Sequence, residues 1–256
     1  MIGSERHPPV LAVVVPVYNE AAWIGPTLAA LAAQTDADFD VVFVDNGSTD
    51  DSVSIITTFA FDRPRWSVIH EPQKGTGAAA DTGMRAAIDA GAGILARTDA
   101  DCLPRPDWTA SMRRALTTDG LQLVGGELVP RTDEGLSRFT RIGLRGAVHL
   151  AEAFGRVRRE NKSSEYLGPY MMAAGCNVGI TADLYLASGG FPRTCIEDLH
   201  EDRALVNAVR RITPRYARRR DIVVFGSSRR VSAWGLKNTL LWYKDHQYRP
   251  EHVDIR

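Results

Sequence analysis

The sequence predicts an α/β fold: a mostly parallel central sheet flanked by helices, followed by a more irregular second half. Two observations predict it. Apolar runs alternate with helical patterns over the first half of the chain, which is typical of strands joined by crossover helices. The first run, residues 10–15, is apolar without a break, as expected for a strand covered on both faces of a parallel sheet.

The elements of the first half follow in order. Ile24, Leu28 and Leu31 lie at helical spacing and predict a helix over residues 23–34. Residues 39–44 form a second apolar run, and the turn and N-cap residues at 45–50 end it before a helix at 51–59. A short strand at 66–69, an alanine-rich helix at 76–90 and a fourth strand at 93–98 complete the alternation.

The second half alternates less regularly. A strand is expected at 121–130, and an amphipathic helix at 136–159 carries six arginines, with Phe139 and Ile142 near its apolar face. The remaining pattern predicts a strand at 175–180, a helix at 182–188, a turn at 189–192, a helix at 199–211 and a strand at 222–225. Because no linker interrupts the chain, we expect one domain over residues 1–256.

Composition excludes several classes of protein. The chain has 256 residues with equal numbers of basic and acidic side chains, 31 of each. A nucleic-acid partner normally requires a basic surplus, so none is expected. Three dispersed cysteines, Cys102, Cys176 and Cys195, predict a reducing cytoplasm rather than a disulfide framework or a zinc site. The apolar runs are too short for a signal peptide core or for a membrane span of about 20 residues.

Carboxylates follow three of the predicted strands. Glu20 follows the first, Asp45 the second, and Asp99 and Asp101 the fourth. Any one of them could be a turn former or helix cap. Together they collect acidic side chains along one edge of the sheet, where they repel one another unless a cation lies among them. A divalent ion carrying diphosphate oxygens is the natural occupant.

A glycine-rich segment offers a different interpretation. Residues 75–80 match the GxGxxA dinucleotide fingerprint, and Asp99 follows at about the required distance of 20 residues. The fingerprint belongs directly after the first strand, whereas this segment follows the third. An oxidoreductase is therefore disfavoured, although Lys74 and the small residues after it can still face phosphates.

The motifs taken together resemble those of the family 2 glycosyltransferases, which have the GT-A fold. The resemblance covers about residues 10–230 and rests on the order of the motifs. They are VVPVYNE at 14–20, VDNGSTD at 44–50, Lys74-Gly75, DAD at 99–101, GCN at 175–177, GGF at 189–191 and HEDRAL at 200–205. It implies a nucleotide-sugar-binding half at about 8–115 and an acceptor-binding, catalytic half at about 116–256.

The resemblance also implies a role for each matched residue. Pro16, Tyr18, Glu20 and Asp45 would hold the base and ribose of a UDP- or GDP-type sugar donor, and Lys74 would approach the nucleotide. Asp99 would bind ribose or metal, and Asp101 would bind the Mn²⁺ or Mg²⁺ ion on the diphosphate. Asp202, with Glu201 beside it, would be the general base of an inverting transfer to a hydroxyl group of a glycan, lipid or small metabolite.

The sequence departs from the family pattern at three places. Asn46 stands where the family often has a second aspartate, and Ala80-Asp81 stands where many members have Arg-Asn. A second acidic pair, Glu197-Asp198, precedes Glu201-Asp202. The later pair is preferred because Leu205 lies three residues after Asp202, as in the family pattern.

Weaker features leave alternatives open. Arg229, in the segment Ser227-Ser-Arg-Arg230, is expected near the diphosphate, and His246 or His252 is a candidate for a further metal ligand. The arginine-rich helix at 136–159 could face water, an acidic acceptor or anionic lipid at the inner face of the membrane.

Two rival functions come from other classes. A nucleotidyltransferase that makes an activated sugar would need a glycine-rich, basic loop after the first strand, where this chain has Pro16-Val-Tyr-Asn-Glu20. A non-catalytic sugar-nucleotide-binding protein would not need the set of Asp99, Asp101 and Asp202.

Overall fold

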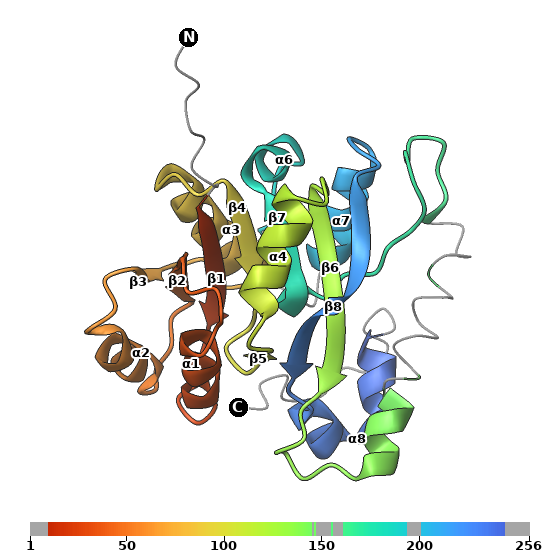
Figure 1. The fold of residues 1–256 in the computed structure, drawn as a ribbon. Helices are drawn as coiled ribbons and strands as arrows, with labels where there is room; N and C mark the ends of the chain where they lie inside the picture. The colour runs from red at the N-terminus through yellow and green to blue at the C-terminus, as the bar shows by residue number, and fades with distance from the viewer. Residues whose placement is uncertain (1–9, 145, 147–154, 156–160, 194–200, 244–256) are drawn as a thin grey trace.

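A single curled sheet organises the protein and confirms the predicted α/β class (Figure 1). The computed structural model describes residues 10–144, 146, 155, 161–193 and 201–243. The strands are β1 Leu11–Val17, β2 Phe39–Asp45, β3 Trp66–His70, β4 Ile94–Arg97, β5 Leu103–Pro104, β6 Leu123–Pro130, β7 Val178–Thr181 and β8 Tyr216–Gly226. The helices are α1 Ile24–Ala32, α2 Ser52–Ala60, α3 Thr76–Asp89, α4 Trp108–Thr117, α6 Ala182–Ala187, α7 Glu201–Arg210 and α8 Arg229–Tyr243.

The eight strands lie in the order β3-β2-β1-β4-β7-β6-β8-β5. The first four are mutually parallel, β7 runs antiparallel to both of its neighbours, and β6 and β8 are parallel to each other. The sheet therefore continues through both predicted halves of the chain. The division into a donor half and an acceptor half remains a prediction.

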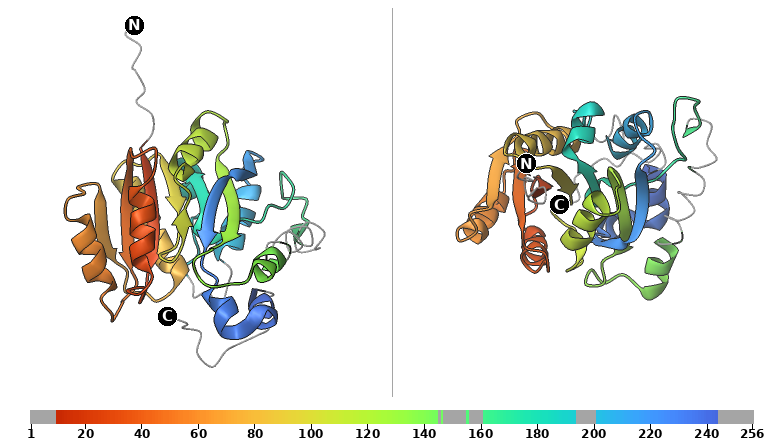
Figure 2. Two further views of the ribbon diagram at one scale, coloured as in Figure 1. Left: turned by 60° about the horizontal axis from the view of Figure 1, so that its bottom comes forward. Right: turned by 45° about the horizontal axis from the view of Figure 1, so that its top comes forward.

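Helices cover both faces of the sheet, as Figure 2 shows. Alternate residues of β1 explain the two layers: Val13 and Val15 pack with α1, α2 and α4, whereas Ala12 and Val14 pack with α3, α6 and α7. All four side chains are buried. This is the environment that a continuously apolar strand requires.

The predicted elements of the first half agree with the structure to within one or two residues. The second half differs more. Residues 175–177 form a 3₁₀ turn rather than the start of a strand, and β8 is longer than expected. α4, β5 and α8 were not predicted from the sequence. Within the long helix expected at 136–159, residues 138–144 are helical, and Phe139 and Ile142 are 87% and 68% exposed.

Asn177 explains the irregularity at 175–177. Its fully buried amide donates to the carbonyl oxygens of Glu127 and Ile222 and accepts from Trp108 Nε1 at 2.9 Å. One side chain thus satisfies polar groups of β6, β8 and α4 that would otherwise be buried without partners. None of the helices among the described residues has the length and apolar character needed to cross a membrane.

Gly83 and Gly25 provide a test of how closely α3 packs on the sheet. A Cβ atom at Gly83 would lie 2.4 Å from Val14 Cγ1 and 2.7 Å from Val44 Cγ2, whereas one at Gly25 in α1 meets nothing within 4 Å. We expect Gly83→Ala to lower the free energy of unfolding by about 1–3 kcal/mol through overpacking. Gly25→Ala should change it by less than about 1 kcal/mol. Urea denaturation measures both, and equal effects would contradict the packing.

Candidate functional site

The predicted site residues gather where β1, β2 and β4 end. These strands are adjacent and parallel, so their carboxyl ends share one edge of the sheet. Hydrogen bonds across the edge fix the loops that leave it: Glu20 N–H donates to Ser52 Oγ at 2.7 Å, and Ala21 N–H donates to Asp50. The left-handed backbone of Asn19, with φ of 53°, turns the chain so that the buried Glu20 follows the strand.

Arg229 joins two of the predicted carboxylates. Its guanidinium donates two hydrogen bonds to Glu20, at 2.8 and 2.9 Å, and one to Asp101 Oδ2 at 2.7 Å. The arginine side chain is 14% exposed and lies over the Trp23 ring. A bidentate, partly buried pair of this kind is stronger than an exposed one. The structure thus places the start of α8 at the acidic edge, and Arg229 next to the residue expected to bind metal.

The segment after β6 holds this arrangement in place. Arg131 donates from Nη1 to the carbonyl oxygen of Asp101 at 2.9 Å, and its guanidinium also pairs with Asp133. Glu134 accepts hydrogen bonds from the backbone N–H and the hydroxyl of Ser228, next to Arg229. Residues 131–134 therefore support both the DAD loop and the start of α8. Sequence analysis missed them because only their position in the fold gives them this role.

Asp45 is buried at the end of β2 and forms the turn that follows it. Its oxygens accept from the backbone N–H groups of Gly47 and Ser48, and Oδ2 lies 3.1 Å from His70 Nδ1. Burial acts to raise the pKa of Asp45, but these hydrogen bonds, chiefly those from Ser48, outweigh it and lower the pKa. The carboxylate is thus ionised at neutral pH. In this structure Asp45 therefore acts as a turn former, which is one of the roles that the sequence allowed for it.

Tyr18 and Lys74 face each other beside Asp45. Lys74 Nζ lies 3.6 Å from the centre of the Tyr18 ring and donates to the carbonyl oxygens of Asn46 and Gly47. Pro16, within β1, is half-buried. Asn46 uses its amide to hold Glu71 O, Gln73 O and Gly75 N–H. An amide donates and accepts at once, which an ionised aspartate cannot do; Asn46 thus braces the loop around Lys74.

Arg97, at the end of β4, was not singled out by sequence analysis. Its guanidinium is 1% exposed and bonds to Asp99 Oδ1 and to Glu201 Oε1, each at 3.2 Å. It connects the DAD loop with the acidic pair that begins α7. Burial raises the pKa of Asp99, as do the nearby Asp101 and Glu201, although Arg97 opposes them.

Asp202 lies at the start of α7 and is half-buried. Its Oδ2 accepts from the backbone N–H of Gly175 at 3.3 Å, and Oδ1 accepts from that of Arg203. Burial and the adjacent Glu201 carboxylate raise the pKa of Asp202 to about 6, against the opposing effects of Arg97 and the two N–H groups. A carboxyl group with a pKa close to working pH has the acidity expected of a general base.

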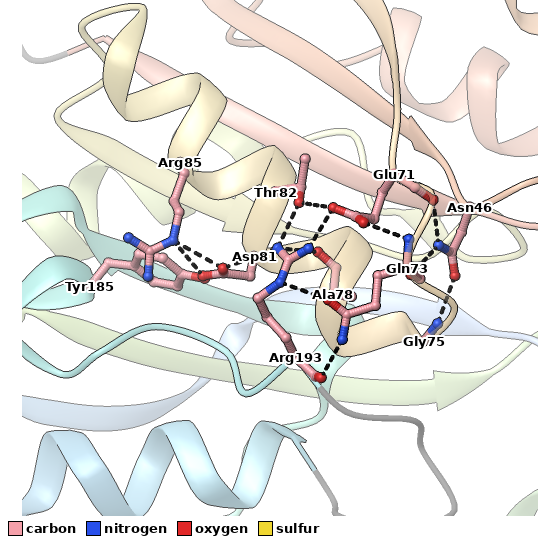
Figure 3. A network of polar contacts seen from close by, with 10 residues as sticks. All are labelled: Asn46, Glu71, Gln73, Gly75, Ala78, Asp81, Thr82, Arg85, Tyr185 and Arg193. Carbon is pink, nitrogen blue, oxygen red and sulfur yellow. Dashed lines mark hydrogen bonds and ion pairs between the residues drawn. The ribbon is translucent and has the colours of Figure 1, made fainter.

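Asp81, within α3, belongs to a polar network that extends through Arg193 and Glu71 to Asn46 (Figure 3). It accepts hydrogen bonds from Arg85 and from the Tyr185 hydroxyl, and it pairs with Arg193. Arg193 also binds Glu71 at 2.7 Å and Thr82 at 2.8 Å. Asp81 departs from the family pattern, and through Arg193 it attaches the segment after Gly189-Gly190 to α3.

Three groups of predicted residues result. Arg229 joins Glu20 to Asp101, Arg97 joins Asp99 to Glu201, and Lys74 packs on Tyr18 near Asp45. Glu197, Asp198, His246 and His252 lie outside the described residues. In the part of the chain that the structure describes, no three His, Cys, Asp or Glu side chains converge as metal ligands would.

Comparison with known proteins identifies the class. The model of the family described as Glycosyl transferase family 2 matches residues 12–185, more than half of the chain, so the protein belongs to that family. The resemblance found in the sequence is thereby confirmed.

The chain matches only part of each individual relative. Over 124 residues the chain is 36% identical to the glycosyltransferase AglE of Haloferax volcanii, covering 47% of this chain and 40% of AglE. It is 37% identical over 117 residues to validoxylamine A glucosyltransferase of Streptomyces hygroscopicus subsp. jinggangensis, covering 45% and 27% of the two chains. The chain thus spans less than half the length of either relative.

Solved structures share the fold. The mannosyltransferase PcManGT from Pyrobaculum calidifontis, in complex with GDP-Man and Mn²⁺, superposes with a TM-score of 0.63 at 23% identity, over 90% of this chain and 60% of that one. A fragment of S. aureus TarS in complex with UDP-GlcNAc gives 0.63 at 16% identity, over 86% and 58% of the chains. These likenesses confirm the predicted GT-A fold.

Arg229 should stabilise the folded protein. Arg229→Met leaves Glu20 and Asp101 close together without their shared cation, and we expect a loss of about 2–4 kcal/mol in the free energy of unfolding. The control is Arg211→Met, since Arg211 is 50% exposed and pairs with Glu165, which is 66% exposed; its effect should stay below about 1 kcal/mol. Equal losses in urea denaturation would show that Arg229 behaves as a surface arginine.

Proposed function

We propose that the protein transfers a sugar from a UDP- or GDP-type donor to a hydroxyl group, with inversion, and that Asp202 is the general base. The observation that carries the proposal is the position and acidity of Asp202. The pKa of its carboxyl group is raised to about 6. Asp202 lies in the first turn of α7 next to Glu201, which is joined through Arg97 to the donor-side Asp99. The family supports the reaction class, and the GDP-Man and UDP-GlcNAc complexes of the structural neighbours support the donor class.

The nucleotide would lie along the ends of β1 and β2. Asp45, ionised and buried, can accept a hydrogen bond from the base or ribose, and Tyr18 offers an aromatic face beside Pro16. Lys74 is exposed and brings a positive charge to the same edge. The residues at the start of α3 are small, so their side chains do not block the approach of phosphate groups to the helix N-terminus. These contacts support the assignment of the first half of the chain to the donor.

Asp101, together with Asp99, would hold a divalent ion on the donor diphosphate. Carboxylate oxygens are the ligands that Mg²⁺ and Mn²⁺ prefer, and Mg²⁺ commonly binds one or two carboxylates together with substrate phosphates. Arg229, bonded to Asp101 Oδ2, shows that this carboxylate already binds a cation. Two carboxylates suit such an ion when diphosphate oxygens complete its ligands, and the ion would neutralise charge that develops on the departing diphosphate. The Mn²⁺ in the PcManGT complex supports the same assignment.

The reaction then requires one proton transfer by the protein. The acceptor oxygen attacks the anomeric carbon from the face opposite the diphosphate, the carbon–diphosphate bond breaks, and Asp202 takes the hydroxyl proton. Backbone N–H groups from Gly175 and Arg203 hold the carboxylate in one orientation. Glu201, paired with the buried Arg97, is a neighbour of the base and not itself the proton acceptor.

The acceptor of the sugar is a candidate for presentation at a membrane surface. Phe139 and Ile142 are largely exposed and lie beside Arg138 and Arg141 on the described part of the arginine-rich helix. Apolar and basic side chains in this arrangement are typical of helices that rest on anionic lipid. They support peripheral contact with a membrane and a lipid-borne acceptor among the candidates; the cytoplasmic location remains a prediction from the sequence.

The rival functions fit the site less well. A nucleotidyltransferase would require a glycine-rich, basic loop after β1, but residues 18–21 are tied by hydrogen bonds to residues 48–52 and contain neither glycine nor a basic residue. A protein that only binds the donor does not require a half-buried carboxyl group of raised pKa such as Asp202. Assay of donor hydrolysis and transfer separates these alternatives.

Asp202→Asn keeps the shape of the side chain and removes its basicity. We expect kcat to fall by ~10²–10⁴-fold with little change in affinity for the nucleoside diphosphate. Because the raised pKa leaves the carboxyl group protonated in acid, wild-type kcat should decline as pH falls through about 6. Steady-state kinetics from pH 5 to 9 measures both effects. Asp198→Asn is the control: a larger loss there would make Glu197-Asp198 the functional pair.

Asp101→Asn tests the metal. In the presence of Mn²⁺, the variant should bind the nucleoside diphosphate at least about tenfold more weakly than the wild type does, because a neutral amide is a poorer metal ligand than a carboxylate. Without Mn²⁺ the two affinities should be similar. Glu20 keeps its pair with Arg229, so the melting temperature should fall only slightly. Calorimetry with and without Mn²⁺ gives the affinities. Full wild-type activity in excess chelator would exclude a metal requirement.

A further inference from the structure

Arg97 occupies a position where a charged side chain is costly. It lies in β4, paired in register with Val14 of the central strand, and only 1% of its side chain is exposed. A buried guanidinium is retained only when it is paired and hydrogen-bonded. What surrounds Arg97 therefore indicates why the chain keeps it there.

Four of the sequence motifs meet at this one guanidinium. Asp99 of DAD and Glu201 of the acidic pair each bond to it at 3.2 Å. Phe191 of the GGF segment presents its ring 5.2 Å from Arg97 Cζ. Gly175 of GCN lies against its flat side, where a Cβ atom would come within 3.1 Å of Cζ. A side chain at Gly175 would therefore crowd Arg97 and require the guanidinium to shift by a few tenths of an ångström.

The same contacts determine the surroundings of the proposed base. Glu201 is held by Arg97, so the adjacent Asp202 is oriented by the first turn of α7. The backbone N–H that binds Asp202 belongs to Gly175, which rests on the guanidinium. Arg97 therefore supports the base from two directions, through helix α7 and through the 3₁₀ turn at 175–177.

We propose that Arg97 is a positioning residue that holds the base Asp202 at a fixed place relative to the donor-side Asp99. Glu201 is then the counter-ion through which Arg97 acts. The inference rests on the proposed function and adds to it the element that couples the two halves of the site. A shift of about 1 Å in a reacting group can cost ~10²-fold in rate, so one rigid connection between donor and base has a large effect on turnover.

A purely structural role is the alternative to exclude. Arg97 would then only neutralise Glu201 and Asp99 in the core, and any folded variant without buried unpaired charge would be fully active. Arg210 provides the matched control. It is as deeply buried, lies at the other end of α7, and bonds to Asn207 and to backbone carbonyls rather than to any predicted site residue.

Four variants distinguish these roles: Arg97→Lys, Arg97→Met, the double variant Arg97→Met/Glu201→Gln, and Arg210→Met. Lysine keeps the charge but lacks the planar fork that reaches two carboxylates. The double variant removes the charge that Arg97→Met leaves buried without a partner. Each is measured for thermal stability, for nucleoside diphosphate affinity by calorimetry, and for kcat with donor and acceptor across pH.

We expect Arg97→Lys to lower kcat by ~10–100-fold while diphosphate affinity changes less than about fivefold. The double variant should regain stability lost in Arg97→Met without regaining kcat. Among the residues that the structure describes, the charged side chains that act most strongly on the pKa of Asp202 are Glu201 on its own helix and Arg97 from β4. Loss of the positive one should therefore move the acid limb of kcat in Arg97→Met to higher pH, by about one pH unit, and Arg210→Met should leave it in place.

Two results overturn the inference in different ways. Wild-type kcat in Arg97→Lys and in the double variant, with an unmoved acid limb in Arg97→Met, would show that Arg97 is a core residue only, with the transferase function intact. A wild-type protein that transfers no sugar from any UDP- or GDP-sugar would overturn the proposed function itself, and this inference with it.

Discussion

Repulsion among carboxylates is the constraint around which the site is built. Glu20, Asp99, Asp101 and Glu201 come from distant parts of the chain to one edge of the sheet, where burial strengthens their mutual repulsion. Two arginines compensate them in pairs: Arg229 lies between Glu20 and Asp101, and Arg97 between Asp99 and Glu201. Each guanidinium is planar and presents several donors, which allows it to bridge two acids at once. Without these bridges, the carboxylates at this edge would repel one another without compensation.

The topology of the sheet explains why these side chains meet at one edge. β1, β2 and β4 end together, and the next strand, β7, runs in the opposite direction. At such a place the connections diverge to the two sides of the sheet and leave their side chains facing a shared space. The short turn at 175–177 precedes β7 and brings Gly175 N–H to Asp202. A rigid scaffold thus presents loops that carry the chemistry.

The sequence was informative where local pattern and order along the chain suffice. Continuous apolar runs gave β1 and β2, and the order of the motifs gave the family and the GT-A fold. α4 was missed although Trp108, Met112 and Leu116 recur at helical spacing, and α8 is interrupted at Gly235, whose φ of 75° breaks the helical pattern. Arg97, Arg193 and Asn177 could not be found this way, because each gains its role from partners more than 40 residues away. Periodicity carries no information about such pairs.

The contact between Arg229 and Glu20 also bears on how the protein is made. It joins residues 209 positions apart, so the ribosome must add 209 residues after Glu20 before Arg229 is in the chain. At about 5–20 residues per second this interval is roughly 10–40 s. During it, β1 to β4 can pair and bury their apolar faces, but the acidic edge still lacks this counter-charge. The pairing of Glu20 and Asp101 with Arg229 therefore forms only after residue 229 has been added, and a shorter nascent chain carries these two carboxylates without that counter-charge.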